Sequence, residues 1–195
     1  ETPVAISWDD QGRLYVCEMR GYMNDINAAG EDKPIGRISR LEDTDGDGKM
    51  DKASVFVDKL LMPRAVMALG DGALVAEPPN LTFYHDTDGD GVADKERTFF
   101  QSPELRNGLG LCVLPNPDGK GTRVIASATG KIWLLTDADG DDKAEKIETL
   151  LTIEGAWDHD HHVHAVVFGP DGKFYFNMGN AGTGLRHADG KQVVD

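Results

Sequence analysis

The stretch Asp43-Thr-Asp-Gly-Asp-Gly-Lys-Met-Asp51 recurs twice with small changes, as Asp86-Thr-Asp-Gly-Asp-Gly-Val-Ala-Asp94 and as Asp137-Ala-Asp-Gly-Asp-Asp-Lys-Ala-Glu145. Carboxylates at the first, third, fifth and ninth positions of so short a loop would repel one another unless a hard cation collects them, and Ca²⁺ takes about six to eight oxygen ligands. The calcium ligands that we expect are Asp43, Asp45, Asp47, Asp51, Asp86, Asp88, Asp90, Asp94, Asp137, Asp139, Asp141 and Glu145. An Asp/Gly-rich turn that only solubilises a hairpin is the alternative.

The residues around each acidic loop predict β-strands. The twelfth loop position, which is a bidentate Glu on an exiting helix in an EF-hand, is Ser54 in the first copy and Arg97 in the second. Residues 53–57 and 97–100, which follow these loops, are rich in β-branched and aromatic side chains and lack a helical period. Each copy is therefore predicted to be the metal-binding tip of a β-hairpin.

A second hairpin pattern, two apolar strands joined by a tight turn, alternates with the acidic loops. It covers residues 4–16, 65–76, 111–119 and 164–176. The pattern recurs about every 50 residues, within the range typical of solenoids, propellers and arrays. Together the two hairpins make a four-stranded unit, and such units repeated radially are β-propeller blades. We predict an all-β propeller of four-stranded blades, and a β-sandwich is the alternative.

The length of the chain, 195 residues, accommodates three such blades and the start of a fourth. We assign one partial β-propeller domain to residues 1–195, with approximate blades at 1–61, 62–105, 106–155 and, incomplete, 156–195. Because propellers typically have about four to eight blades, we expect the missing blades in another chain, in a removed segment or in a symmetry mate. Without them, an apolar blade face would be exposed at each end.

The composition restricts the partners and the location. With 34 acidic and 20 basic side chains the formal charge is −14, which argues against nucleic acid and anionic membranes as partners. No apolar run is long enough to span a bilayer and no signal peptide remains at the start, so we expect a soluble mature chain. Weak calcium loops suit the millimolar calcium outside the cytoplasm, which predicts a periplasmic or extracellular location.

The two cysteines, Cys17 and Cys112, lie in predicted strands of different blades. Two cysteines are too few for a disulfide framework, and neither belongs to a Cys-x-x-Cys-His haem site. We expect both to be buried free thiols, and a disulfide between them is the alternative.

The segment Trp157-Asp-His-Asp-His-His-Val-His164 contains four of the six histidines. It lies where the innermost strand of the fourth blade is predicted to begin, at the end that faces the central channel of a propeller. If the segment is extended, His162 and His164 point to one face and His159 and His161 to the other, so one metal ion cannot easily bind all four. A two-histidine metal site with a neighbouring aspartate, a general base and a structural channel lining remain open.

Most of the chain resembles the N-terminal propeller of the planctomycete-type (PVC) haem-binding Cys-x-x-Cys-His proteins, a family often described as membrane-bound dehydrogenases. The segments that carry the resemblance are Gly12-Arg-Leu-Tyr-Val-Cys-Glu-Met-Arg-Gly-Tyr-Met23, Gly30-Glu-Asp-Lys-Pro-Ile-Gly-Arg-Ile38, Glu42-Asp-Thr-Asp-Gly-Asp-Gly48, Val75-Ala-Glu-Pro-Pro-Asn-Leu81 and residues 157–180. The resemblance implies helical repeats and a c-type cytochrome domain beyond the propeller, with electron transfer outside the cytoplasm. The haem would not lie in this chain.

Residues 157–180 are also similar, more distantly, to the quinone-dependent sugar dehydrogenases. Their pattern has a catalytic histidine seven residues before the aromatic or aliphatic residue of the Phe-Gly-Pro-Asp-Gly turn, and counting back from Phe168 gives His161. The similarity implies that His161 removes the hydroxyl proton of a sugar while hydride passes to pyrroloquinoline quinone, with Asp160 orienting the base. It departs from the pattern where the expected Gly-Arg is His164-Ala165, and His164 is a further candidate catalytic residue.

Two classes of function follow. In the first, the chain is part of an extracytoplasmic sugar or alcohol dehydrogenase-like oxidoreductase, in which Arg64, Asn107 and His162 contact the cofactor at the channel mouth and electrons pass to a haem domain elsewhere. In the second, it is a calcium-stabilised propeller that binds a protein or glycan without chemistry.

Overall fold

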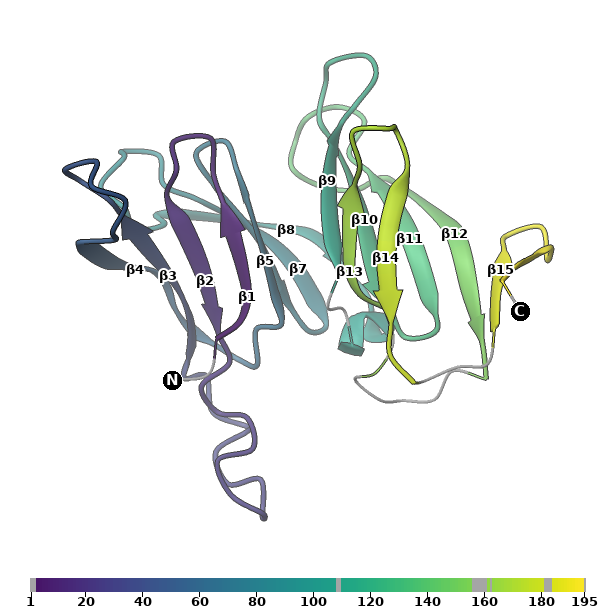
Figure 1. Ribbon diagram of the computed structural model, residues 1–195, viewed down its shortest axis with the longest axis horizontal. Coiled ribbons are helices and arrows are strands. Elements are labelled where there is room, and N and C mark those ends of the chain that lie inside the picture. The colour runs from purple at the N-terminus through teal and green to yellow at the C-terminus, as the bar shows by residue number, and fades with distance from the viewer. Residues whose placement is uncertain (1–2, 108–109, 156–160, 162, 181–183, 195) are drawn as a thin grey trace. The chain divides into compact units, whose positions relative to one another are not determined.

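The computed structural model describes residues 3–107, 110–155, 161, 163–180 and 184–194. The described residues form antiparallel strands and one short 3-10 helix, η1 (Pro103–Asn107) (Figure 1). Within these ranges, no helix has the length and apolar character needed to cross a membrane. The chain divides into two compact units, Glu1–Thr98 and Phe99–Asp195, which are described in turn.

The first unit is built on two four-stranded antiparallel sheets in which each strand lies beside the next one in the chain. The strands of the first sheet are β1 (Pro3–Trp8), β2 (Leu14–Glu18), β3 (Gly36–Glu42) and β4 (Lys52–Leu60). Those of the second are β5 (Ala65–Leu69), β6 (Gly72–Glu77), β7 (Asn80–His85) and β8 (Lys95–Gln101), which runs past the boundary of the unit. The predicted order of an apolar hairpin followed by an acidic-tipped hairpin is confirmed in both sheets.

The core of the first unit lies between its two sheets. The rings of Tyr15 on β2 and Phe56 on β4 meet edge to face, with centroids 5.1 Å apart, in a cluster that includes Ile38 and Val75. Residues 72–76 of β6 are buried at every position, and therefore on both faces of the strand. Burial on both faces explains why this segment is continuously apolar or small and does not alternate with polar residues.

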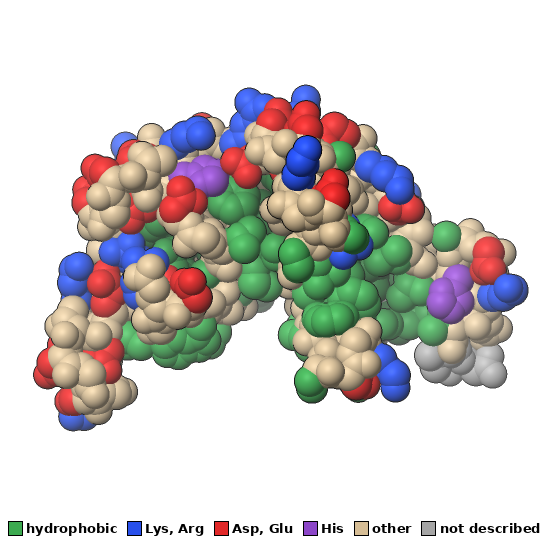
Figure 2. Space-filling model, turned by 90° about the horizontal axis from the view of Figure 1, so that it is seen from above, with side chains coloured by type: hydrophobic (Ala, Val, Ile, Leu, Met, Phe, Trp, Pro, Cys, Tyr) green, Lys and Arg blue, Asp and Glu red, His purple; other side chains and the backbone are tan. Residues whose placement is uncertain are grey.

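The first strand, β1, has one covered face and one exposed face. Its Ser7 Oγ accepts a hydrogen bond of 2.9 Å from the backbone N–H of Ala68 on β5. The side chains that alternate with Ser7 are those of Val4, Ile6 and Trp8, which are 41%, 61% and 55% exposed. Apolar side chains, drawn in green, are visible on the face of the molecule that Figure 2 shows. An apolar strand face of this kind is unusual on the surface of a monomeric protein.

The second unit contains a six-stranded sheet and a separate hairpin. The sheet includes β9 (Leu111–Pro115), β10 (Thr122–Ala128), β11 (Lys131–Thr136), β12 (Lys146–Glu154), β15 (Gly184–His187) and β16 (Gln192–Val194). The hairpin consists of β13 (Val163–Phe168) and β14 (Phe174–Met178), and β13 lies against β9 and β10. Val163 and Val166 are buried there together with Ile125.

The last two strands, β15 and β16, lie in the part of the chain assigned to the incomplete fourth blade, residues 156–195. β15 pairs with β12, with Ile153 opposite Leu185, and so extends the sheet that contains β9 to β12. Leu185 is 5% exposed in this position, and Arg186 Nε lies 2.5 Å from Glu154 Oε1. Burial of Leu185 and the ion pair between Arg186 and Glu154 both favour the pairing of β15 with β12.

The prediction of two buried free cysteines is confirmed, because Cys17 and Cys112 are both unbridged and buried. Burial raises the pKa of the Cys17 thiol to about 12, and burial also raises the pKa of Cys112. Since the thiolate is the reactive form, neither side chain should react with Ellman's reagent at pH 8 in the native chain.

Both thiols should react once the chain is unfolded in guanidinium chloride, and a cysteine placed in the exposed turn by Asp10→Cys should react at once in the native chain. Rapid labelling of Cys17 under native conditions would contradict its burial.

Candidate functional site

The three acidic loops occupy the tips of the hairpins β3–β4, β7–β8 and β11–β12, as predicted. The first aspartate of each loop accepts hydrogen bonds from two backbone N–H groups, those of the fourth and sixth loop residues. Asp43 accepts from Gly46 at 2.7 Å and from Gly48 at 2.8 Å. The N–H of Gly48 and the other N–H groups of the loop lower the pKa of Asp43. The equivalent bonds are made by Asp86 and Asp137.

The sixth position needs a left-handed backbone, which explains its glycines. Gly48 and Gly91 have φ of 86° and 96°. Asp142, which replaces glycine in the third loop, still adopts a φ of 63°. Aspartate is among the few non-glycine residues that tolerate this region, so the third loop keeps the same shape despite the substitution.

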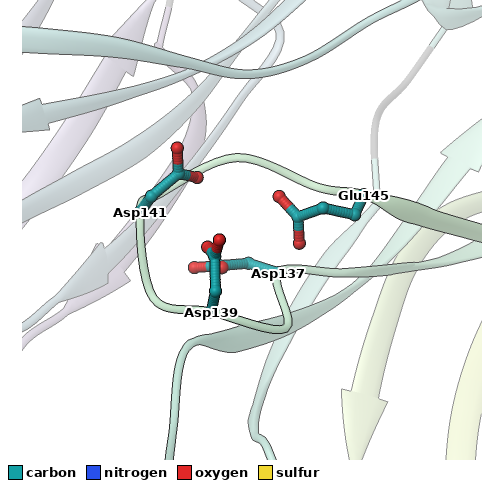
Figure 3. A group of neighbouring side chains, drawn as sticks. All are labelled: Asp137, Asp139, Asp141 and Glu145. Atoms are coloured by element: carbon teal, nitrogen blue, oxygen red, sulfur yellow. The ribbon is translucent and has the colours of Figure 1, made fainter.

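This shape gathers most of the predicted ligands. Oxygens of Asp137, Asp139, Asp141 and Glu145 all lie within 4.8 Å of one another. Figure 3 shows these side chains around one loop, with the carboxylate of Glu145 facing those of Asp137 and Asp139. The third loop, which departs most from the motif, is thus the one that collects all four of its predicted ligands. Carboxylate oxygens are the ligands that hard cations such as Ca²⁺ prefer.

The first two loops gather three carboxylates each. The groups are Asp43, Asp45 and Asp51 in the first loop and Asp86, Asp88 and Asp90 in the second. Asp47 instead lies 3.0 Å from Lys49 Nζ, and Asp94 accepts a hydrogen bond of 2.7 Å from Thr87 Oγ1.

The second loop is also tied to the first sheet. Arg40 Nη1 on β3 lies 3.0 Å from Asp86 Oδ2, and these side chains are only 3% and 4% exposed. Arg40 Nη2 also donates to Glu42 Oε1 at 2.7 Å. The backbone N–H of Ala93 donates to the carbonyl oxygen of Phe56 on β4 at 2.9 Å. The buried guanidinium of Arg40 therefore bonds both Glu42, the residue before the first loop, and Asp86, the first residue of the second loop.

Part of the predicted histidine site lies within the described residues. His161 is exposed, and its Nδ1 is 2.6 Å from Oδ1 of Asn180. His164 on β13 is half-buried, and its ring centroid is 6.3 Å from that of His161. β13 begins only at Val163, so the alternation of faces expected for an extended segment does not extend to His161. Asp158, His159, Asp160 and His162 lie outside the described residues.

The other predicted cofactor contacts lie on different units. Arg64 is half-buried before β5, and its backbone N–H donates to the carbonyl oxygen of Ala76 at 2.8 Å. Asn107 ends η1 in the second unit. Two residues that sequence reasoning missed are Asn180 and Arg40, both of which find their partners through strand pairing or sheet packing over long sequence distances.

The four-stranded antiparallel units with acidic-tipped hairpins define the class of this chain as a β-propeller protein. Two solved structures support the same fold: a candidate 6-phosphogluconolactonase from Bacteroides uniformis has a TM-score of 0.52 at 15% identity, covering 90% of this chain and 50% of that one. A glucose dehydrogenase has a TM-score of 0.51 at 18% identity, with 90% and 57% coverage. The chain therefore spans about half the length of these propellers.

The sequence matches DUF7133, a domain family of unknown function, over residues 1–109 and 118–195, and the chain belongs to this family. No curated protein matches it by sequence.

The contact between Gly91 and Arg40 provides a test of the second loop. A Cβ at Gly91 would collide with the guanidinium of Arg40, whereas a Cβ at Gly89 would meet nothing within 4 Å, and both glycines have positive φ. Gly89→Ala should cost about 1–2 kcal/mol of unfolding free energy, the penalty for a left-handed alanine. Gly91→Ala should cost about 3 kcal/mol more, because it displaces one partner of a buried ion pair. Urea unfolding of both variants measures the difference. Equal losses of unfolding free energy would contradict a stabilising role for the ion pair between Arg40 and Asp86.

Proposed function

We propose that this chain is the calcium-binding propeller part of an extracytoplasmic oxidoreductase that oxidises a sugar or alcohol, with His161 as the general base. The observation that carries the proposal is the hydrogen bond between His161 and Asn180, beside the hairpin β13–β14 of a fold shared with a glucose dehydrogenase. A base must be held in a defined orientation to take a proton from a substrate hydroxyl. The amide of Asn180 supplies such an anchor, and Asp160, the orienting residue predicted from the sequence, remains a further proposed partner of the base.

The proposed cofactor is pyrroloquinoline quinone, which when bound supplies the hydride acceptor. Oxidation of an alcohol carbon then requires that its hydroxyl proton leave to a base, and His161 takes that proton while His164 lies beside it. The quinone carries three carboxylates, and the guanidinium of half-buried Arg64 has the charge to bind one of them. Asn107 and His162 are the further proposed contacts.

Calcium is the proposed ion of the three loops. Clusters made only of carboxylates suit a hard cation, and the repulsion within each cluster is relieved by the ion. In this proposal the role of calcium is to hold the hairpin tips rather than to take part in the reaction, and the domain works in the periplasm or outside the cell, where calcium is abundant.

The proposed partners are further propeller blades and a c-type cytochrome domain. The exposed face of Val4, Ile6 and Trp8 supports the first, because a closed propeller covers both faces of each blade. The resemblance to PVC-type proteins supports the second, and the haem domain would receive electrons from the reduced quinone.

The calcium proposal predicts a difference between two matched variants of the third loop. Asp139→Asn removes a member of the carboxylate group, whereas Asp142→Asn removes the same charge from a residue outside it. Calcium at about 100 times its dissociation constant should stabilise the wild-type chain by about 2.7 kcal/mol per site that binds only the folded form. Asp139→Asn should lose the contribution of the third loop and Asp142→Asn should keep it.

Thermal unfolding in calcium and in chelator measures both effects. If Asp139→Asn lowers the melting temperature equally in the two conditions, the carboxylate has a role other than binding calcium.

The base assignment predicts that His161→Gln lowers the quinone-dependent reduction of a dye by sugars about 100-fold or more, the usual contribution of a general base. His187→Gln, at an exposed histidine of β15, is the control and should leave the rate unchanged. Undiminished turnover by His161→Gln would remove His161 from the reaction. Failure of the wild-type chain to bind the quinone would favour the non-catalytic binding propeller.

A further inference from the structure

His161 and Asn180 lie just beyond the open end of the hairpin β13–β14. The last pair of that hairpin is Val163 with Met178, so the two residues follow paired strand ends rather than belonging to the ladder. Their side chains meet there, with His161 Nδ1 2.6 Å from Asn180 Oδ1.

The backbone holds the same two segments close together. A Cβ at Gly179 would lie 2.7 Å from the carbonyl oxygen of His161 and 3.0 Å from its Cβ. Only a glycine permits this approach. The His161–Asn180 contact is therefore accompanied by a close backbone approach at the neighbouring Gly179.

The chemistry of the two side chains assigns the proton between them. Nδ1 of His161 faces Oδ1 of Asn180 at 2.6 Å, and an amide oxygen can only accept a hydrogen bond. The facing nitrogen must then carry the hydrogen, and a neutral imidazole has only one, so the lone pair resides on Nε2.

We propose that Asn180 is a positioning residue that keeps His161 in the Nδ1–H tautomer, so that Nε2 is the atom that takes the proton of the substrate hydroxyl. The inference rests on the proposed function for its catalytic meaning, but the tautomer itself can be measured without any cofactor. The orienting group that it names is a neutral amide, whereas Asp160, which the sequence suggested for this role, lies outside the described residues.

Long-range ¹H–¹⁵N correlation spectra of the histidine rings test the tautomer directly. The His161 signals are identified by their disappearance in His161→Gln. The wild-type chain should show a protonated Nδ1 at a pH where the ring is neutral. Asn180→Ala should move His161 toward the Nε2–H form, whereas Asn180→Asp should retain the wild-type tautomer because a carboxylate accepts the same hydrogen. Asn177→Ala, at an exposed asparagine of β14, should leave the spectrum of His161 unchanged.

An Nε2–H tautomer in the wild-type chain, or an unchanged tautomer in Asn180→Ala, would overturn the proposal. In the dye assay with pyrroloquinoline quinone, Asn180→Ala should lower kcat about tenfold or more with little change in KM, and Asn180→Asp should restore most of it. The two failures are distinguishable: an inactive wild-type chain whose tautomer depends on Asn180 contradicts only the proposed reaction. An active chain whose tautomer ignores Asn180 contradicts only the positioning role.

Discussion

The hydrogen bonds from two backbone N–H groups to the first aspartate of each acidic loop are the interaction on which the hairpin tips depend. They hold the loop in one conformation through the carboxylate of Asp43, Asp86 or Asp137. That conformation turns further carboxylates toward a common centre, where like charges at short range repel. Other carboxylates of the loops also accept backbone hydrogen bonds, for example Asp45 from the N–H of Asp47 and Glu145 from the N–H of Ala138. The first aspartate differs from them in accepting two such bonds, one from each of two loop residues.

Local patterns were enough to predict the strands and the loops. The alternation of apolar residues, the turn glycines and the spacing of aspartates are patterns that extend over about ten residues. Strands β1 to β12 and the loops between them agree with these patterns. The third loop illustrates the limit of a strict motif, because Asp142 and Glu145 depart from it and the carboxylates still converge. The tolerance of aspartate for positive φ explains the first departure. That Asp142 can replace glycine at this position could have been predicted only from the tolerance of aspartate for positive φ.

Long-range features could not be predicted in the same way. The pairing of Arg40 with Asp86 depends on how two sheets meet, and the addition of β15 to β12 depends on which edge buries Leu185 best. Asn180 was missed because it lies far from His161 in the sequence, and the two side chains meet only once β13 and β14 have paired. Contacts that form across a hairpin are thus the feature that single-sequence reasoning is least able to supply.

The guanidinium of Arg40, which bonds both Glu42 and Asp86, has a consequence for how these loops can diverge. A side chain shared by two carboxylates makes their contributions non-additive, since losing one partner changes the charge that the other experiences. Substitutions around the first two loops are accordingly expected to show epistasis, with the cost of a change in one loop set by the residue present in the other.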